Sequence, residues 1–359
     1  MTLQIQQIII ICKVVRCMHI GERIRYGRVK AGLSLRDLGE KLGITQTALN
    51  NYEKGITTPD SQRLIKIAKV LDLPIEYFFR QEPVTTLHPL AFRKKMDLKQ
   101  KDLKKIIEGT RDWLERFVMI ELILDEKREV ELPSAIHISR PEDIEDAAVQ
   151  LRRYWNLGQD PIENLMDVLE DHGIKIGLVD APEAFVGMTI KVNDEYPVIV
   201  VNRNISGDRQ RLTIAHEIGH LVLNVAPDID EDRLYHRFAG AFLFPKDQVR
   251  RELGEGRKRI GLEELCILKH RYGLSMMAIL YRAYENGYIS NAAFQKIHIT
   301  FRKNKWHRVE PMKPYLPEEP SSMNLMIMRA YSEGIITRGR ANEIFGGDIA
   351  TICGCVDCA

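Results

Sequence analysis

The feature of the sequence that most constrains the fold is one apolar segment that carries two histidines and a glutamate. Within residues 211–224, His216, Glu217 and His220 form an H-E-x-x-H pattern. Residues four apart lie on the same face of a helix, so both imidazoles can reach one metal ion. Polar groups on a buried helix need partners, and Gly219 in the helix interior suits close packing around such a site. The segment therefore predicts a buried helix with a metal-binding face.

The same pattern indicates a type of chemistry. Two neutral imidazoles suit Zn²⁺, and a site with three protein ligands leaves a fourth position for water. The carboxylate of Glu217 lies beside the first histidine, where it can take a proton from that water for attack on a peptide carbonyl. The alternative is a chance pattern of two solvated histidines, which the apolar flanks disfavour. A metzincin site is excluded, because Leu223 and Ala226 stand where that class has glycine and histidine.

Length and composition bound the number and class of domains. A chain of 359 residues should hold two or three domains, and 45% hydrophobic with 28% charged residues is ordinary for a globular protein. The net charge of +2 means that any basic surface for nucleic acid must be local. Six cysteines without a framework spacing favour a reduced, cytoplasmic protein. Residues 1–17 are too short and too charged to span a membrane, so we expect a disordered extension and no membrane partner.

Residues 18–80 have the pattern of a compact helical domain. Ser34 is expected to cap a helix at 35–42 and Thr45 a helix at 46–53, with a glycine turn at Gly43 between them. Two short helices joined by such a turn form a helix-turn-helix, whose second helix enters the major groove of DNA.

Residues 32–55 resemble the lambda-repressor/Cro-like (XRE) DNA-binding domain. The resemblance implies that four side chains of the recognition helix face the bases, namely Gln46, Thr47, Asn50 and Asn51. Gln and Asn can pair with adenine, and Thr can meet a thymine methyl group. Leu35 replaces the family's usual glutamine, which weakens one phosphate contact, whereas Gly39 keeps the small size that the contact between helices needs.

This domain carries only a modest positive charge. Residues 20–80 carry eleven Lys and Arg against seven Asp and Glu, a net charge of +4. That balance is consistent with one half-site per chain and a homodimer on operator DNA. The alternative is a helix-turn-helix that serves as a protein-interaction unit.

The rest of the chain divides into a connector, a second domain and a tail. Residues 81–134 are expected to form a helical connector, whose apolar stripe packs on the second domain or on another subunit. Residues 135–295 carry helices, a strand at 174–179, a hairpin of 185–192 with 196–202, and then the H-E-x-x-H helix. This order is that of a zincin-type peptidase, and an extended peptide could add to one edge of its sheet. Residues 296–359 are expected to form a C-terminal helical segment and tail.

The H-E-x-x-H segment and the residues after it resemble one family. Residues 211–220 together with 236–245 are similar to the ImmA/IrrE zinc metallopeptidases, over about residues 135–290. Members with an N-terminal XRE domain share the layout of this chain. The resemblance implies Zn²⁺ as the cofactor and a protein substrate that is itself an XRE-type repressor.

The resemblance also bears on the third metal ligand. The family has a glutamate where this chain has Asp232, whose shorter side chain requires a shift of the helix. We predict Asp232 as the third ligand beside His216 and His220. Glu231 is the substitute, although it points about 100° away around the helix. His236 lies one turn after Asp232 on the same face, where it could ligate zinc or donate to the oxyanion. We expect it to support the site or to pack in the core.

The sequence thus predicts an α+β protein. An all-helical lambda-repressor-like domain is followed by a zincin-like peptidase domain with a small antiparallel sheet and C-terminal helices. The expected function is a DNA-binding transcriptional regulator fused to a zinc endopeptidase that cleaves a regulatory protein. The alternative is a non-catalytic repressor or antitoxin-like protein that uses the peptidase fold to sense or bind a partner, and Asp232 slightly favours it.

Overall fold

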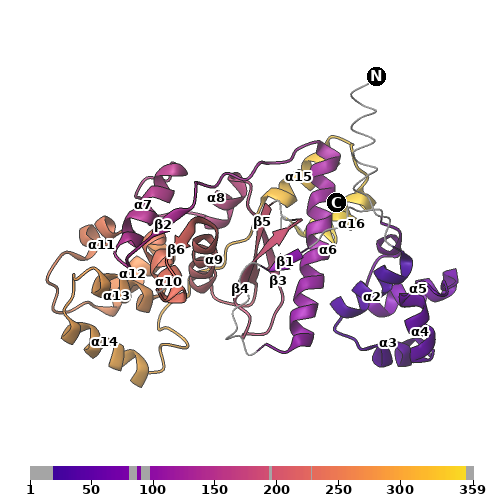
Figure 1. Cartoon of the computed structure of the whole chain (residues 1–359), viewed down its shortest axis with the longest axis horizontal. Helices are drawn as coiled ribbons and strands as arrows, with labels where there is room; N and C mark the ends of the chain where they lie inside the picture. Colours follow the sequence, from indigo (N-terminus) through magenta and orange to yellow (C-terminus); the bar gives the residue numbers. More distant parts are fainter. Residues whose placement is uncertain (1–18, 81–86, 90–97, 194–195, 228, 353–359) are drawn as a thin grey trace.

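The computed structural model describes residues 19–80, 87–89, 98–193, 196–227 and 229–352. The expected extension at residues 1–17 and the cysteine tail (Cys353, Cys355 and Cys358) lie outside these residues. Figure 1 shows a helical domain at one end, a long helix beside a small sheet in the middle, and a helical lobe at the other end.

Residues 19–80 form the helical domain. Its elements are α2 (Ile20–Lys30), α3 (Leu35–Leu42), α4 (Gln46–Glu53), α5 (Ser61–Leu71) and the 3-10 helix η1 (Ile75–Phe79). Both predicted caps form: the Asp37 N–H donates to Ser34 Oγ and the Ala48 N–H donates to Thr45 Oγ1, each at 3.1 Å. A Cβ on Gly39 would lie 3.0 Å from the Ile44 carbonyl oxygen, so α3 and the turn approach as closely as expected.

A mixed sheet lies at the centre of the molecule. Its strands, in spatial order, are β1 (Leu87–Pro89), β4 (Gly187–Val192), β5 (Tyr196–Asn202) and β3 (Lys175–Val179). The expected hairpin forms, because β4 and β5 pair antiparallel, and β1 also pairs antiparallel with β4. However, β3 pairs parallel with β5. The sheet is therefore not purely antiparallel as predicted, because β1 takes the outer edge of β4 and leaves β3 to pair with β5.

The long helix α6 (Gln100–Leu124) contacts the helix-turn-helix domain, the sheet and the C-terminal helices (Figure 1). Its Ile106 and Leu114 pack on the sheet against Ile190 and Val198. Another side, which includes Phe117, packs on two C-terminal helices, α15 (Ser322–Ser332) and α16 (Arg338–Phe345). The apolar stripe predicted for the connector is thus covered within one chain.

The helical lobe lies on the opposite face of the sheet from α6. Its elements are β2 (Ile136–Ile138), α7 (Asp143–Tyr154), α8 (Leu165–Asp171), α9 (Gly207–Val222), β6 (Leu223–Val225), α10 (Glu231–Leu243), α11 (Lys246–Leu253), α12 (Leu262–Tyr272), α13 (Met276–Glu285) and α14 (Asn291–Lys303). β2 pairs parallel with β6. Helix α9 shares a core with β5 through Ile214, Ile218 and Ile199. Among helices in the described ranges, none combines the length and apolar character needed to cross a bilayer.

The chain after α14 returns along the lobe and is held there by buried charges. Lys269 pairs with Asp208 at 3.3 Å and with Glu310 at 2.7 Å. Arg211, at the start of the H-E-x-x-H segment, pairs with Glu318 and donates to the Ile162 carbonyl at 2.8 Å. The C-terminal segment then ends in α15, α16 and the 3-10 helix η2 (Ile349–Thr351).

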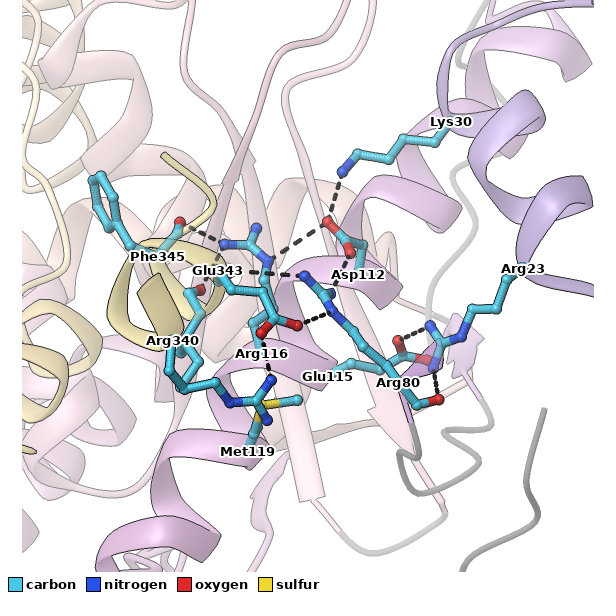
Figure 2. A network of polar contacts seen from close by, with 11 residues as sticks. Arg23, Lys30, Arg80, Asp112, Glu115, Arg116, Met119, Arg340, Glu343 and Phe345 are labelled. Carbon is cyan, nitrogen blue, oxygen red and sulfur yellow. Dashed lines mark hydrogen bonds and ion pairs between the residues drawn. The ribbon is translucent and has the colours of Figure 1, made fainter. Parts of the chain in front are cut away.

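The helix-turn-helix domain is joined to α6 by buried ion pairs (Figure 2). Arg23 on α2 donates to Glu115 at 2.6 Å, and each of these residues is only 1% exposed. Lys30, at the end of α2, donates to Asp112 at 2.6 Å. Losing one partner of such a pair leaves a buried charge without compensation, which is strongly destabilising. The domain is therefore held in one orientation on α6.

The same network extends to the C-terminal helices. Arg80, the residue after η1, bridges Asp112 at 3.2 Å and Glu343 on α16 at 2.9 Å. Arg116 on α6 donates to the Phe345 carbonyl at the end of α16 at 2.5 Å. Burial opposes ionisation of Asp112, but the charges of Arg116, Lys30 and Arg80 outweigh it and hold the pKa of Asp112 at about 2. This carboxylate is therefore charged at neutral pH and links three segments of the chain.

Replacing Glu115 with alanine tests this interface. The substitution leaves Arg23 buried without its carboxylate, and removing one partner of a buried pair typically costs about 3–5 kcal/mol. We expect the midpoint of urea unfolding to fall and the connector to become more sensitive to limited proteolysis. Glu40→Ala, which removes an exposed partner of Arg36 in the same domain, is the control and should leave both unchanged. Equal unfolding midpoints for Glu115→Ala and wild type would contradict the role of the pair.

Candidate metal centre and recognition helix

Helices α9 and α10 cross closely at the predicted metal site. A Cβ on Gly219 would lie 3.0 Å from Tyr235 Cδ1 and 3.2 Å from Phe238 Cδ1. The glycine predicted to permit close packing therefore lies at the crossing itself, and a larger side chain would push α10 away. This contact brings the first turns of α10 to the face of α9 that carries the histidines.

The two histidines of α9 converge through the same ring nitrogen. His216 Nε2 and His220 Nε2 are 3.2 Å apart, with His216 buried and His220 half-buried. Two nitrogens bound tetrahedrally to zinc, at bond lengths of about 2.0–2.1 Å, lie about 3.3 Å apart. The pair therefore has the separation of two adjacent zinc ligands, and its donor chemistry fits that ion.

The residues of α10 approach the first histidine. Asp232 Oδ1 is 3.9 Å from His216 Nε2, and its side chain is 51% exposed. The ring of His236 is 4.5 Å from that of His216. Two groups have ligand atoms within 4.8 Å of one another, His216–Glu217–His220 and His216–Asp232–His236, and they share His216. The predicted ligands therefore fall into two groups that share His216: His220 lies in the group with Glu217, and Asp232 lies in the group with His236.

Glu217 is held by a residue that the sequence analysis did not single out. The Thr189 hydroxyl on β4 donates to Glu217 Oε2 at 2.8 Å, and both side chains are buried. Because side chains alternate along a strand, Thr189 faces α9 while Met188 and Ile190 face α6. In the sequence, Thr189 stands out only as a polar residue within an apolar strand. Its role becomes clear only when the fold shows that it faces α9.

Tyr235 is a second residue of the site that the sequence did not reveal. Its ring centroid lies 4.0 Å from that of His220 and 5.6 Å from that of His216. Burial, together with the nearby Glu231 carboxylate, raises the pKa of the Tyr235 hydroxyl. The phenol is therefore protonated at neutral pH, and its ring limits the rotation of His220.

The recognition helix α4 presents its predicted DNA-contacting side chains at the surface of the helical domain. Gln46 and Thr47 are exposed, and Asn50 and Asn51 are half-buried. The docking contacts on α6 come instead from α2 and the residue after η1, so the interface leaves α4 open. Leu35, the departure from the usual glutamine, packs partly buried against the core of the domain.

Two protein-family models match the chain. A helix-turn-helix model matches residues 24–78, and the model of the IrrE N-terminal-like domain, a peptidase family, matches residues 169–284. The chain joins a helix-turn-helix domain to an IrrE N-terminal-like domain. Both family resemblances and the α+β fold class predicted from the sequence are thereby confirmed. Helices α6, α15 and α16 lie outside both matched ranges.

Curated relatives match the helix-turn-helix part. An uncharacterized HTH-type transcriptional regulator of Sinorhizobium medicae is 41% identical over 66 residues, which are 18% of this chain and 48% of the relative. The HTH-type transcriptional regulator ImmR of Bacillus subtilis is 27% identical over 95 residues, 26% of this chain and 70% of the relative. The chain thus spans about half the length of the first of these relatives.

Among solved structures, Bacillus thuringiensis PlcR in complex with a peptide and DNA is 13% identical and covers 89% of this chain and 99% of its own, at a TM-score of 0.17.

Metal content of alanine variants tests the ligand set of the IrrE-like domain. We expect about one zinc per wild-type chain, and its loss in His220→Ala and in Asp232→Ala. His236→Ala should retain zinc, as should the control Glu263→Ala, which removes an exposed carboxylate on α12. Zinc lost from His236→Ala but kept by Asp232→Ala would assign the third ligand to His236 instead.

Proposed function

We propose that the protein is a DNA-binding transcriptional regulator whose second domain is a zinc-dependent endopeptidase. The observation that carries the proposal is the convergence of His216 and His220 at 3.2 Å with the buried carboxylate of Glu217 between them in sequence. That constellation lies within a domain of a peptidase family. As a regulator that acts on DNA, the protein would work in the cytoplasm.

The peptidase chemistry follows from how the side chains are held. His216, His220 and Asp232 would hold the zinc ion, which when bound supplies a Lewis acid that polarises the scissile carbonyl. Glu217 accepts a proton from the attacking water and returns it to the leaving amine. Thr189 donates to one carboxylate oxygen of Glu217 at 2.8 Å, which holds the carboxylate in position on α9.

The substrate that we propose is a regulatory protein of the XRE type. The ImmA/IrrE resemblance implies such a substrate, and the relative ImmR is itself an HTH-type regulator. The helix-turn-helix domain of this chain would bring the peptidase to operator DNA, where such a repressor is concentrated. A homodimer would contact two half-sites, as the modest charge of one domain suggests.

Replacing Glu217 with glutamine tests the catalytic role. The amide cannot accept a proton, so we expect cleavage of an XRE-type repressor encoded near this gene to be lost while zinc content is unchanged. The measurement is gel electrophoresis of the repressor after incubation, beside zinc analysis of each enzyme. Glu263→Gln, which changes an exposed glutamate on α12, is the matched control and should cleave as the wild type does. Unchanged cleavage by Glu217→Gln would rule out this residue as general base.

A mobility-shift assay tests the proposed DNA binding by the helix-turn-helix domain. Gln46→Ala and Asn50→Ala each remove a side chain that can pair with a base, and a good bidentate pair is worth about 1–3 kcal/mol. We therefore expect about tenfold or greater loss of affinity for the DNA directly upstream of the gene, in the presence of excess nonspecific DNA. Gln100→Ala, an exposed glutamine on α6, should bind normally. Normal binding by both helix variants would favour a protein-interaction role for this domain.

The second candidate is a non-catalytic regulator whose IrrE-like domain senses or binds a partner. The position of Asp232 favours it, because the carboxylate is half exposed and lies 3.9 Å from His216 Nε2. The side chain of aspartate is shorter than that of glutamate, so it reaches less far towards a metal ion shared with the histidines. Zinc-free wild-type protein that still binds DNA would support this candidate.

A further inference from the structure

The outer edge of β4 runs directly past the candidate catalytic glutamate. The Asn202 N–H donates to the Val186 carbonyl at 2.9 Å, which makes these two residues a hydrogen-bonded pair of the ladder between β4 and β5. Bonding alternates along an antiparallel strand, so the main-chain groups of Gly187, Thr189 and Lys191 face the outer edge. Thr189 is also the residue whose side chain holds Glu217.

This edge is paired with β1, which lies in the chain between the helix-turn-helix domain and α6. In β1, His88 lies opposite Lys191 and Pro89 opposite Ile190, in antiparallel register. His88 and Lys191 therefore form the hydrogen-bonded pair, while Pro89, which has no N–H to donate, falls at the position where none is needed. Leu87 packs against the core between α6 and the sheet. Among the described residues, the pairing extends to Ile190, the neighbour of Thr189.

The segment between Arg80 and Gln100, which contains β1, is held on α6 at both ends. Arg80, the residue before it, is buried in ion pairs with Asp112 and Glu343 (Figure 2). The chain after the connector enters α6 itself at Gln100. A segment tethered at both ends meets the edge of β4 at a high effective concentration, so even a three-residue strand competes well with a free peptide. Docking of the helix-turn-helix domain thus favours occupation of the edge.

We propose that β1 is an internal competitor for the outer edge of β4, the edge at which an extended peptide substrate would add as a strand. Strand addition uses main-chain hydrogen bonds and makes little demand on side chains. A substrate lying antiparallel to β4 passes Thr189 and Glu217, and it needs the Lys191 groups that β1 uses. The proposal rests on the peptidase function for its catalytic meaning, but the binding itself can be measured without catalysis.

The test uses the full chain with Glu217→Gln, so that a bound peptide is not cut. His88→Pro removes the one connector N–H that pairs with Lys191, whereas His88→Ala removes only the side chain and is the matched control. The probe is a fluorescent peptide with the sequence of residues 83–93. Peptide affinity is measured by anisotropy, and exchange of the Lys191 and Thr189 amide hydrogens is measured in each variant.

We expect the Lys191 amide to exchange at least about tenfold faster in His88→Pro than in His88→Ala, which corresponds to about 1.4 kcal/mol. The peptide should bind His88→Pro at least tenfold more tightly than the parent, and its binding should restore protection of Lys191. Equal exchange in the two variants would show that β1 is not paired. Equal peptide affinity would show that β1 does not compete for the site.

Cleavage separates this proposal from the proposed function. With Glu217 restored, His88→Pro should cleave a repressor substrate faster than His88→Ala. If neither cleaves, yet the peptide binds His88→Pro and protects Lys191, the edge is a peptide site in a non-catalytic protein. That outcome would support competition between β1 and the peptide, and it would contradict the proposed peptidase function.

Discussion

The arrangement of this protein depends on carboxylates buried along one helix. Asp112, Glu115 and Glu121 of α6 are each at least nine-tenths buried, and each has a basic partner from another part of the chain. Glu115 pairs with Arg23 of the helix-turn-helix domain, and Glu121 pairs with Lys175 of β3 at 2.8 Å. Burying a charge is costly unless its partner is placed well. Such pairs therefore contribute more to the choice of one docking geometry than to the overall stability of the fold.

This geometry connects two sites that the sequence presents as separate. The recognition helix α4 faces away from α6, so the docked domain keeps its DNA-contacting side chains accessible. The connector leaving that domain reaches the sheet at β4, whose Thr189 holds Glu217. The docked domain therefore lies next in the chain to the strand that pairs with β4 near the candidate catalytic residue.

The candidate metal centre depends on a close helix crossing. Gly219 permits α10 to approach α9, and Tyr235 then lies 4.0 Å from the ring of His220. This placement also brings Asp232 and His236 towards the histidines, since both lie on the face of α10 that meets α9. The convergence of two imidazole nitrogens at 3.2 Å would be unfavourable for two protonated rings, and it suits a shared cation.

Local patterns in the sequence determined the elements and the chemistry. Ser34 and Thr45 predicted their helix starts because a cap is set by neighbours within three residues. The spacing of His216 and His220 predicted a shared helix face, because that geometry belongs to the helix alone. The helix-turn-helix and the hairpin of β4 and β5 followed for the same reason.

Contacts between distant segments were decided only by the tertiary structure. The parallel pairing of β3, the addition of β1 and the bond from Thr189 to Glu217 each join residues without a local signal. Likewise, nothing near Asp112 or Glu115 indicates that their partners lie about 80 or 90 positions earlier. The sequence determined which side chains could act, and long-range packing decided which of them meet, because the energy of a buried pair depends on a distance that only the folded chain sets.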